Sequence, residues 1–184
     1  MRRWPVMVVA VVTLGALSGA VAYQHVVPRQ GDHKGAWQEI AWPFPRDGWP
    51  AGRAFRCRGA SCGDGVEVYV RPKLGFCNCD RGVADDDEVD RVADVDLISQ
   101  GFVPLAPGEV VQVADMAGRT RAYDLKASDG SRRVATGIAV SRRCDLLVAV
   151  AHGNGDAWET RRAALALLAN REMTRWMMAA MEGR

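Results

Sequence analysis

The chain has 184 residues, which suits one folded domain with an appendage, and 48% of them are hydrophobic, enough to form a packed core. Its formal net charge is +2, and Arg2 and Arg3 alone account for it, because the first acidic residue is Asp32. The rest of the chain is electrically balanced, which excludes the basic footprint needed to bind nucleic acid or anionic lipid.

The first predicted element is the apolar segment 4–22, which follows Arg2 and Arg3 and contains no charged residue. Its length is close to the roughly 20 residues that cross a membrane as a helix. Positive charge before such a segment predicts a cytoplasmic amino terminus and an exported carboxyl end. Two interpretations stay open: residues 1–22 are a retained signal anchor, or a signal peptide cleaved after Ala22. Either one places the folded part in the periplasm, and the first tethers it to the inner membrane.

Residues 23–44 are predicted to form a tether, because they mix glycine, proline, histidine and tryptophan without a clear period. A stretch rich in turn residues follows, and it opens the predicted periplasmic domain, residues 45–184. Four aromatic side chains are expected either to pack this strip onto the domain or to lie at the membrane surface: Trp37, Trp42, Phe44 and Trp49.

The domain itself is predicted to begin with strands. Alternation of apolar and polar residues, or β-branched runs bounded by glycine, indicates strands at 54–57, 66–70, 109–114 and 119–125. Two longer apolar runs, 134–140 and 144–151, are separated by three polar residues, which predicts a hairpin of central strands.

The carboxyl end is predicted to be helical. Asp156 can cap a helix, and Glu159 follows at the spacing of a capping box. Trp158, Leu165, Leu168 and Trp176 recur at helical spacing, and Asn170 is expected to divide the helix in two. The predicted fold class is α+β: an antiparallel β-sheet packed against a C-terminal helix and preceded by one N-terminal transmembrane or signal helix.

This order of elements resembles the PsbP-like α/β sandwich over about residues 50–180. The resemblance rests on the run from Gly118 through Tyr123, the hairpin around Cys144, and the closing helix with Leu168 and Trp176. The paired cysteines around Phe76 are not part of that family's pattern. The resemblance implies a non-enzymatic accessory or scaffold role facing a lumen or periplasm, and it carries over no site residues.

Export would place the five cysteines in an oxidising compartment, where disulfides persist. Four of them form two pairs in the sequence, Cys57 with Cys62 and Cys77 with Cys79. A bridge between Cys77 and Cys79 is unfavourable, because residues i and i+2 of a strand lie near the upper limit of disulfide spacing. One or two disulfides joining the 57/62 segment to the 77/79 segment are therefore predicted, with Cys144 as a buried free thiol.

The alternative is a metal site. The same four thiolates, from Cys57, Cys62, Cys77 and Cys79, could hold zinc tetrahedrally or bind copper as Cu(I). The tight Cys-x-Cys spacing disfavours zinc. A redox-active pair is also disfavoured, since it would want a Cys-x-x-Cys at a helix start, and the sequence has none.

The most acidic stretch contains Asp85, Asp86, Asp87, Glu88 and Asp90. Two functional interpretations are an acidic surface for a partner and a calcium site, although the stretch lacks the spacing of an EF-hand loop. The spacing of Asp85 and Glu88 also predicts a capped short helix, with acids that complement its dipole and with an apolar inner face from Val89.

No serine-hydrolase elbow, P-loop, haem-attachment motif or zinc-protease helix occurs in the sequence. The sequence therefore predicts a membrane-tethered periplasmic accessory or interaction domain without a cofactor, which would be a small subunit or assembly factor of an envelope complex. Its partners would be the membrane, through residues 4–22, and a protein of the envelope. The alternative function is thiolate handling of zinc or copper by the four clustered cysteines.

Overall fold

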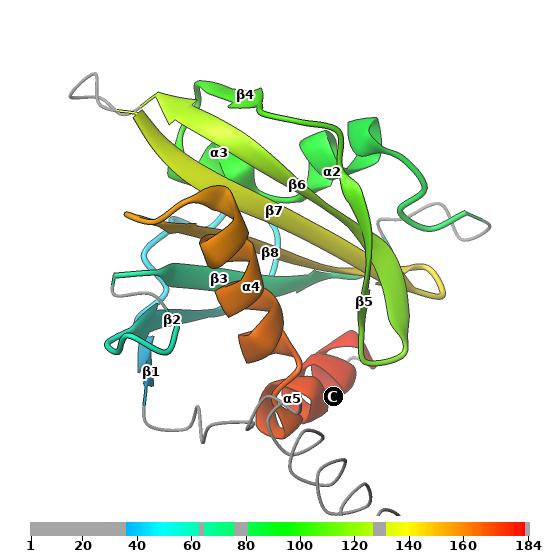
Figure 1. Ribbon diagram of the computed structural model, residues 1–184. Helices are drawn as coiled ribbons and strands as arrows, with labels where there is room; N and C mark the ends of the chain where they lie inside the picture. The colour runs from blue at the N-terminus through cyan, green and yellow to red at the C-terminus, as the bar shows by residue number, and fades with distance from the viewer. Residues whose placement is uncertain (1–35, 63–64, 76–80, 127–131, 183–184) are drawn as a thin grey trace, which may run out of the picture. The chain divides into compact units, whose positions relative to one another are not determined.

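The computed structural model describes residues 36–62, 65–75, 81–126 and 132–182 (Figure 1). The chain divides into two units, Met1–Asp32 and His33–Arg184, and every described residue belongs to the second. The predicted membrane segment, residues 4–22, therefore lies outside the described residues. Within the described ranges, no helix is long and apolar enough to cross a membrane.

An eight-stranded antiparallel sheet forms the centre of the described residues, in the order β1-β2-β3-β8-β7-β6-β4, with β5 also paired to β6. Its strands are β1 (Trp37–Ile40), β2 (Arg53–Cys57), β3 (Glu67–Lys73), β4 (Phe102–Pro104), β5 (Glu109–Val113), β6 (Met116–Lys126), β7 (Arg132–Arg142) and β8 (Asp145–Gly153). The predicted hairpin is confirmed: β7 and β8 pair from Arg142↔Asp145 onward in the middle of the sheet.

Helices cover both faces of this sheet. In Figure 1, α4 (Ala157–Leu168) crosses the front, while α2 (Asp86–Val92) and α3 (Val95–Ile98) lie behind, and α5 (Arg171–Met181) follows α4. Two hydrophobic clusters correspond to the two faces. The prediction of an antiparallel sheet with a C-terminal helix is thus confirmed. The structure also has a second helical layer, formed by α2 and α3, on the other face of the sheet. Because of that layer β3 is buried on both sides, so the expected half-buried alternation is wrong there.

The predicted cap at Asp156 and the predicted break at Asn170 are both present. The Asp156 carboxylate accepts from the Glu159 amide at 2.8 Å and begins α4. Asn170 ends that helix and begins the next, because its side chain accepts from the Glu172 amide at 2.9 Å. The second helix, α5, buries three methionines at a spacing of four residues: Met173, Met177 and Met181.

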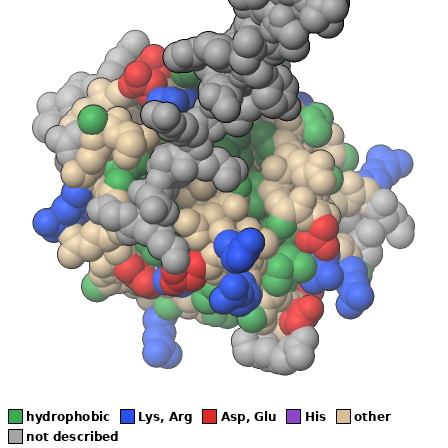
Figure 2. Space-filling model, turned by 60° about the horizontal axis from the view of Figure 1, so that its bottom comes forward, with side chains coloured by type: hydrophobic (Ala, Val, Ile, Leu, Met, Phe, Trp, Pro, Cys, Tyr) green, Lys and Arg blue, Asp and Glu red, His purple; other side chains and the backbone are tan. Residues whose placement is uncertain are grey.

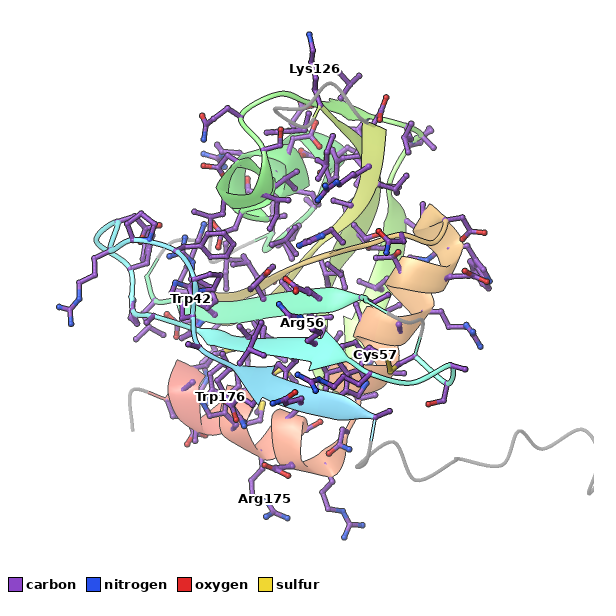
Figure 3. All side chains as sticks on the ribbon, turned by 90° about the vertical axis from the view of Figure 1, so that its left-hand side faces the viewer. Trp42, Arg56, Cys57, Lys126, Arg175 and Trp176 are labelled. Atoms are coloured by element: carbon purple, nitrogen blue, oxygen red, sulfur yellow. A yellow bond between two sulfur atoms is a disulfide. The ribbon has the colours of Figure 1, made fainter. Side chains whose placement is uncertain are left out.

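The predicted tether reaches too far along the chain. Its last part is β1, an edge strand that pairs with β2. After β1 the strip folds back onto the sheet, where the ring of Phe44 lies 5.3 Å from Trp42 and 4.8 Å from Tyr69, centroid to centroid. Trp42 lies on the side of the sheet away from α4 (Figure 3). The aromatic residues of this strip therefore pack on the domain, as one of the two interpretations predicted.

An ion pair fastens the end of this strip. Arg71 of β3 donates from both terminal nitrogens to the Asp47 carboxylate, at 2.8 and 2.7 Å. This bidentate pair lowers the pKa of Asp47 from 3.8 to about 2. A carboxyl with a lowered pKa stabilises the folded state above its unfolded pKa, and the contribution is lost as the pH falls through the folded one.

We therefore expect the stability difference between the wild type and Asp47→Asn to be constant above pH 5 and to disappear as the pH falls from about 4 to about 2. Urea unfolding at a series of pH values measures this difference. A difference that persists unchanged at pH 2 would contradict the role of the Arg71–Asp47 ion pair.

Candidate functional site

A groove runs between the outer side of α4 and the strands β5 and β6. It consists of two adjoining hollows of about 200 and 230 Å³, which share Glu109, Trp158 and Arg161. We call it the α4–β5 groove; its walls are Ala106, Pro107, Glu109, Val111, Thr120, Arg121, Ala122, Ala157, Trp158, Arg161, Arg162 and Leu165.

Trp158 is the principal aromatic of this groove, and its side chain is 61% exposed. The Arg161 guanidinium lies 4.7 Å from the centroid of its ring, in cation–π contact, and also pairs with Glu109 of β5. Trp158 lies on the outer side of α4. The face of the helix that packs on the sheet is formed by other residues, among them Ala163 and Ala164. The Trp158 side chain is therefore held in place without being buried.

Most of the large exposed hydrophobic side chains lie on elements that form or flank the groove. Of the five large hydrophobic side chains that are exposed within the described ranges, four lie on β4, the loop after it, β5 and α4. They are Val103, Leu105, Val110 and Trp158. Of these four, Trp158 lines the groove, while Val110 lies on the opposite face of β5. Single exposed apolar residues are normal on a surface, so Trp158 is the one that marks the groove.

The structure pairs much of the predicted acidic surface with arginines of β6. Asp86 accepts from Arg119 at 2.7 Å and from the Gly108 amide at 2.8 Å, and that backbone hydrogen bond is the main cause of its lowered pKa. Asp90 accepts from Arg121 and from the hydroxyl of Tyr123, both at 2.7 Å. These two carboxylates therefore hold α2 against the sheet.

The remaining acids of the stretch have local roles or lie on the surface. Asp85 caps α2 by accepting from the Glu88 amide at 2.9 Å, as predicted, and Val89 is buried beneath the helix. Glu88 also pairs with Arg91, while Asp87 is exposed in the first turn. Among the described residues, no group of three or more histidine, cysteine or acidic side chains is placed to hold a metal ion.

A second polar cluster lies where β2, β3 and β8 run side by side. Glu67 accepts from Arg56 at 2.6 Å and from the Tyr69 hydroxyl, and its carboxylate lies 3.6 Å from Nε2 of His152. Burial raises the pKa of Tyr69, and the hydrogen bond to Glu67 raises it further. Burial lowers the pKa of His152, so the imidazole is neutral at neutral pH. The cluster therefore joins three strands through the Glu67 carboxylate.

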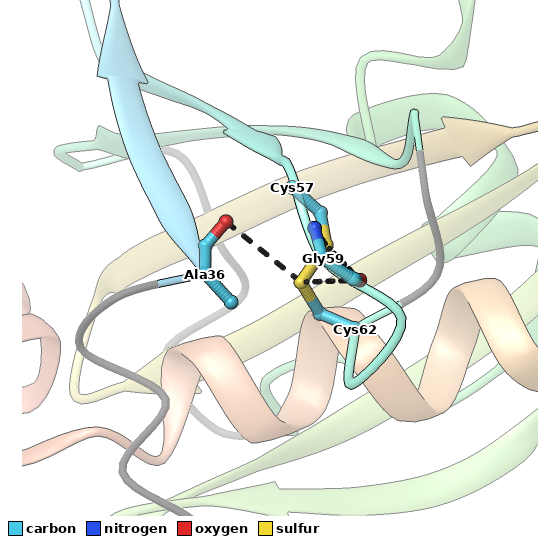
Figure 4. Close-up of a disulfide and its surroundings, with 4 residues drawn as sticks. All are labelled: Ala36, Cys57, Gly59 and Cys62. Atoms are coloured by element: carbon cyan, nitrogen blue, oxygen red, sulfur yellow. Dashed lines mark hydrogen bonds between the residues drawn. A yellow bond between two sulfur atoms is a disulfide. The ribbon is translucent and has the colours of Figure 1, made fainter.

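Cys57 and Cys62 form a disulfide with each other, so the predicted bridges from this segment to the 77/79 segment are wrong (Figure 4). The turn after β2 brings their Cα atoms to 6.0 Å, and both side chains are buried in the core below α4. The loop also binds the start of β1, because the Arg58 amide donates to the Ala36 carbonyl at 2.8 Å.

Cys144 also differs from its prediction. It lies exposed in the turn between β7 and β8, and it is disulfide-bonded, not a buried free thiol. Cys77 and Cys79 lie outside the described residues. A four-thiolate site is not formed here, since Cys57 and Cys62 are bonded to each other, and metal binding stays a prediction for the reduced protein.

Removing the Cys57–Cys62 bridge should lower the free energy of unfolding by about 2 kcal/mol, the value for a loop of this size in the chain-entropy account. The double variant Cys57→Ala, Cys62→Ala avoids leaving a free thiol, and urea unfolding measures the loss. Reduction of the wild type should cost more, because it also opens the bridge of Cys144. Equal losses in the two experiments would contradict this account.

The charged side chains on the face shown in Figure 2 are of both signs and lie interspersed with hydrophobic ones. This is the pattern of a solvated surface with pairs of opposite charge.

Comparisons with known proteins give one result at the level of the fold. No protein-family model matches the sequence, and no curated protein matches it. Among solved structures, the chain is similar to the solution structure of cyanobacterial PsbP (CyanoP) from Synechocystis sp. PCC 6803. The two are 17% identical, the match covers 73% of this chain and 79% of that chain, and the TM-score is 0.44. The PsbP-like resemblance expected from the sequence is thus confirmed as a weak one, and it carries over no residue or activity.

Proposed function

We propose that this protein is a membrane-tethered accessory domain that binds a protein partner through the α4–β5 groove. The observation that carries the proposal is the exposed Trp158, held by Arg161 in the α4–β5 groove. Tryptophan and arginine are the side chains most enriched among the residues that dominate binding energy at protein interfaces.

The other polar clusters of the described residues support a binding role over a catalytic one. The carboxylates of α2 are engaged with Arg119 and Arg121, and Asp94 is engaged with Arg71 and Lys73 inside the domain. Their contacts are those of a scaffold that holds two layers together.

The membrane-tethered part of the proposal rests on residues 1–22. Their uncharged run after two arginines favours export of the folded domain and, if the run is retained, a tether to the inner membrane. The partner would then be a component of an envelope complex, for which this chain serves as a small subunit or assembly factor.

The test is purification of the full chain from its native membranes in gentle detergent. We expect it to run in a complex larger than itself, and Trp158→Ala to weaken that complex about 30-fold, as the loss of a dominant interface residue of about 2 kcal/mol does. The matched control is Leu74→Ala, an exposed apolar residue on another part of the surface, which should have no effect. A chain that runs alone, or a complex indifferent to Trp158→Ala, would overturn the proposal.

A further inference from the structure

We infer that the partner contributes an extended segment that adds to the outer edge of β5 as a further antiparallel or parallel strand. This inference rests on the proposed function and specifies how the α4–β5 groove is used. The hydrogen-bonding groups of the β5 backbone would bind the main chain of the segment, and the groove would bind alternate side chains, as in strand addition generally.

The register of the β5–β6 hairpin shows which backbone groups of β5 face outward. Val113 pairs with Met116 across a two-residue turn, in which Ala114 has a positive φ of 54°. Residues that flank such a turn exchange hydrogen bonds with each other, and the pattern then alternates along the strand. Val111 therefore bonds inward to β6, while Val110 and Gln112 direct their N–H and C=O groups away from the sheet.

From Val110 onward, this edge lacks the protection that natural sheets usually place on their edges. Charged residues, proline and bulges normally prevent an edge strand from pairing with another chain. From Val110 to Ala114 there is no charge and no proline, and the register with β6 is unbroken. The Val110 side chain is 75% exposed. Glu109, the one charged residue of β5, begins the strand and is paired with Arg161 of α4.

The two faces of β5 determine what the added segment would contact. Val110 and Gln112 lie on one face, while Glu109 and Val111 lie on the other and line the α4–β5 groove. A side chain that points from the added strand toward this second face would meet the groove and Trp158. Apolar side chains at every second position of the segment fit this arrangement, because side chains alternate between the faces of a sheet.

The charged residues of the groove indicate which charge the bound segment would carry. Within the groove, Arg161 is paired with Glu109, and Arg121 is paired with Asp90. Arg162 is exposed and has no ion-pair partner among the described residues, so the groove carries one positive charge in excess. A segment with an acidic residue near Arg162 would neutralise it. A second copy of this chain would bring the same arginines together, which disfavours self-pairing at this edge.

The test uses the full chain in detergent and a display library of random eight-residue peptides. We expect the enriched peptides to alternate apolar and polar residues and to carry an aspartate or glutamate at one end. Binding of an enriched synthetic peptide should protect the amides of Val110 and Gln112 from hydrogen exchange. The amide of Val111 is already bonded within the sheet, so its protection should not change.

Gln112→Pro removes one outward N–H while leaving the bonds to β6 in place, since proline is tolerated where the N–H faces solvent. We expect this variant to bind the peptide at least tenfold more weakly, and Gln112→Thr, which keeps the N–H, to bind it as the wild type does. The hydrogen-exchange result on the wild type tests the inference independently of whether Gln112→Pro folds.

The inference is overturned if no peptide is enriched, if the enriched peptides have apolar residues at helical spacing, or if the amides of Val110 and Gln112 are already protected in a dimer of the free chain. It is also overturned if the membrane complex is lost with Trp158→Ala but kept with Gln112→Pro. In that last case the proposed function stands and only strand addition fails. Loss of the complex with both variants supports both.

Discussion

Asp94→Asn is expected to lower the free energy of unfolding by about 3–5 kcal/mol, the cost of removing one partner from a buried ion pair. The Asp94 carboxylate accepts from Nε of Arg71 at 2.6 Å and from Nζ of Lys73 at 2.5 Å. All three side chains are less than a tenth exposed. Without the carboxylate, two cations would remain buried together, with Asp47 as an acidic partner of Arg71.

The backbone of Asp94 provides the control. This residue has a φ of 61°, a conformation that asparagine adopts as readily as aspartate and that glycine adopts without strain. Asp94→Gly should therefore relieve the backbone while still removing the carboxylate that Arg71 and Lys73 share, and it should remain strongly destabilised. Urea unfolding at neutral pH measures both variants. An Asp94→Asn protein within 1 kcal/mol of the wild type would show that water or Asp47 replaces the lost charge.

Gly118→Ala is expected to destabilise the domain by about 3 kcal/mol, at the upper end of the usual range for overpacking. A Cβ at this position of β6 would lie 2.0 Å from the Ala139 carbonyl oxygen and 2.6 Å from the Cα of Val140. Both atoms belong to the backbone of β7, which pairs with β6 from Ala117↔Ser141 to Lys126↔Arg132 and so includes Gly118. They cannot move without breaking hydrogen bonds along that pairing.

Gly101→Ala is the matched control for this variant. A Cβ on Gly101 would meet only the Cβ of Lys126, at 3.6 Å, which is an ordinary van der Waals contact. We expect its unfolding midpoint in urea to stay close to that of the wild type, and far-UV circular dichroism to show native content for both variants. A Gly118→Ala protein as stable as Gly101→Ala would mean that β6 and β7 separate at this point more easily than their register indicates.

The elements that the sequence predicts correctly are those whose signals are local. Asp156 and Asn170 act on amides two or three residues away, so their capping roles can be inferred without knowing what the helices pack against. The β7–β8 hairpin is similar, because two apolar runs that flank a short polar turn have few other ways to pair.

The elements that the sequence misplaces depend on distant partners. β1 is four residues long and only half-buried, so its own residues give no period, and it is a strand because β2 offers it an edge. The pairing of Cys57 with Cys62 depends on how the turn after β2 closes, which spacing along the chain does not determine.

The candidate site shows the same dependence. Trp158 and Leu168 share helical spacing, yet one is exposed and the other is fully buried. The inner face of α4 is made of Thr160 and alanines as well as leucines, and these small side chains let the helix lie close to the sheet. The hydrophobic pattern of the helix alone predicts that Trp158, its largest apolar residue, is buried. In the structure, small side chains form much of the inner face, and Trp158 lies on the outer side.

The pairing of α2 and α3 with the sheet has a consequence for damaged molecules. Arg71, Lys73, Arg119 and Arg121 all project from the same face, and their acidic partners include Asp86, Asp90 and Asp94 on the segment that covers it. Proteolytic removal of this segment would uncover these four cations, of which Arg71 would keep Asp47 as a partner. That face would then be positively charged and would attract nucleic acid or other anionic polymers, so the same short segment that covers the sheet also balances its charge.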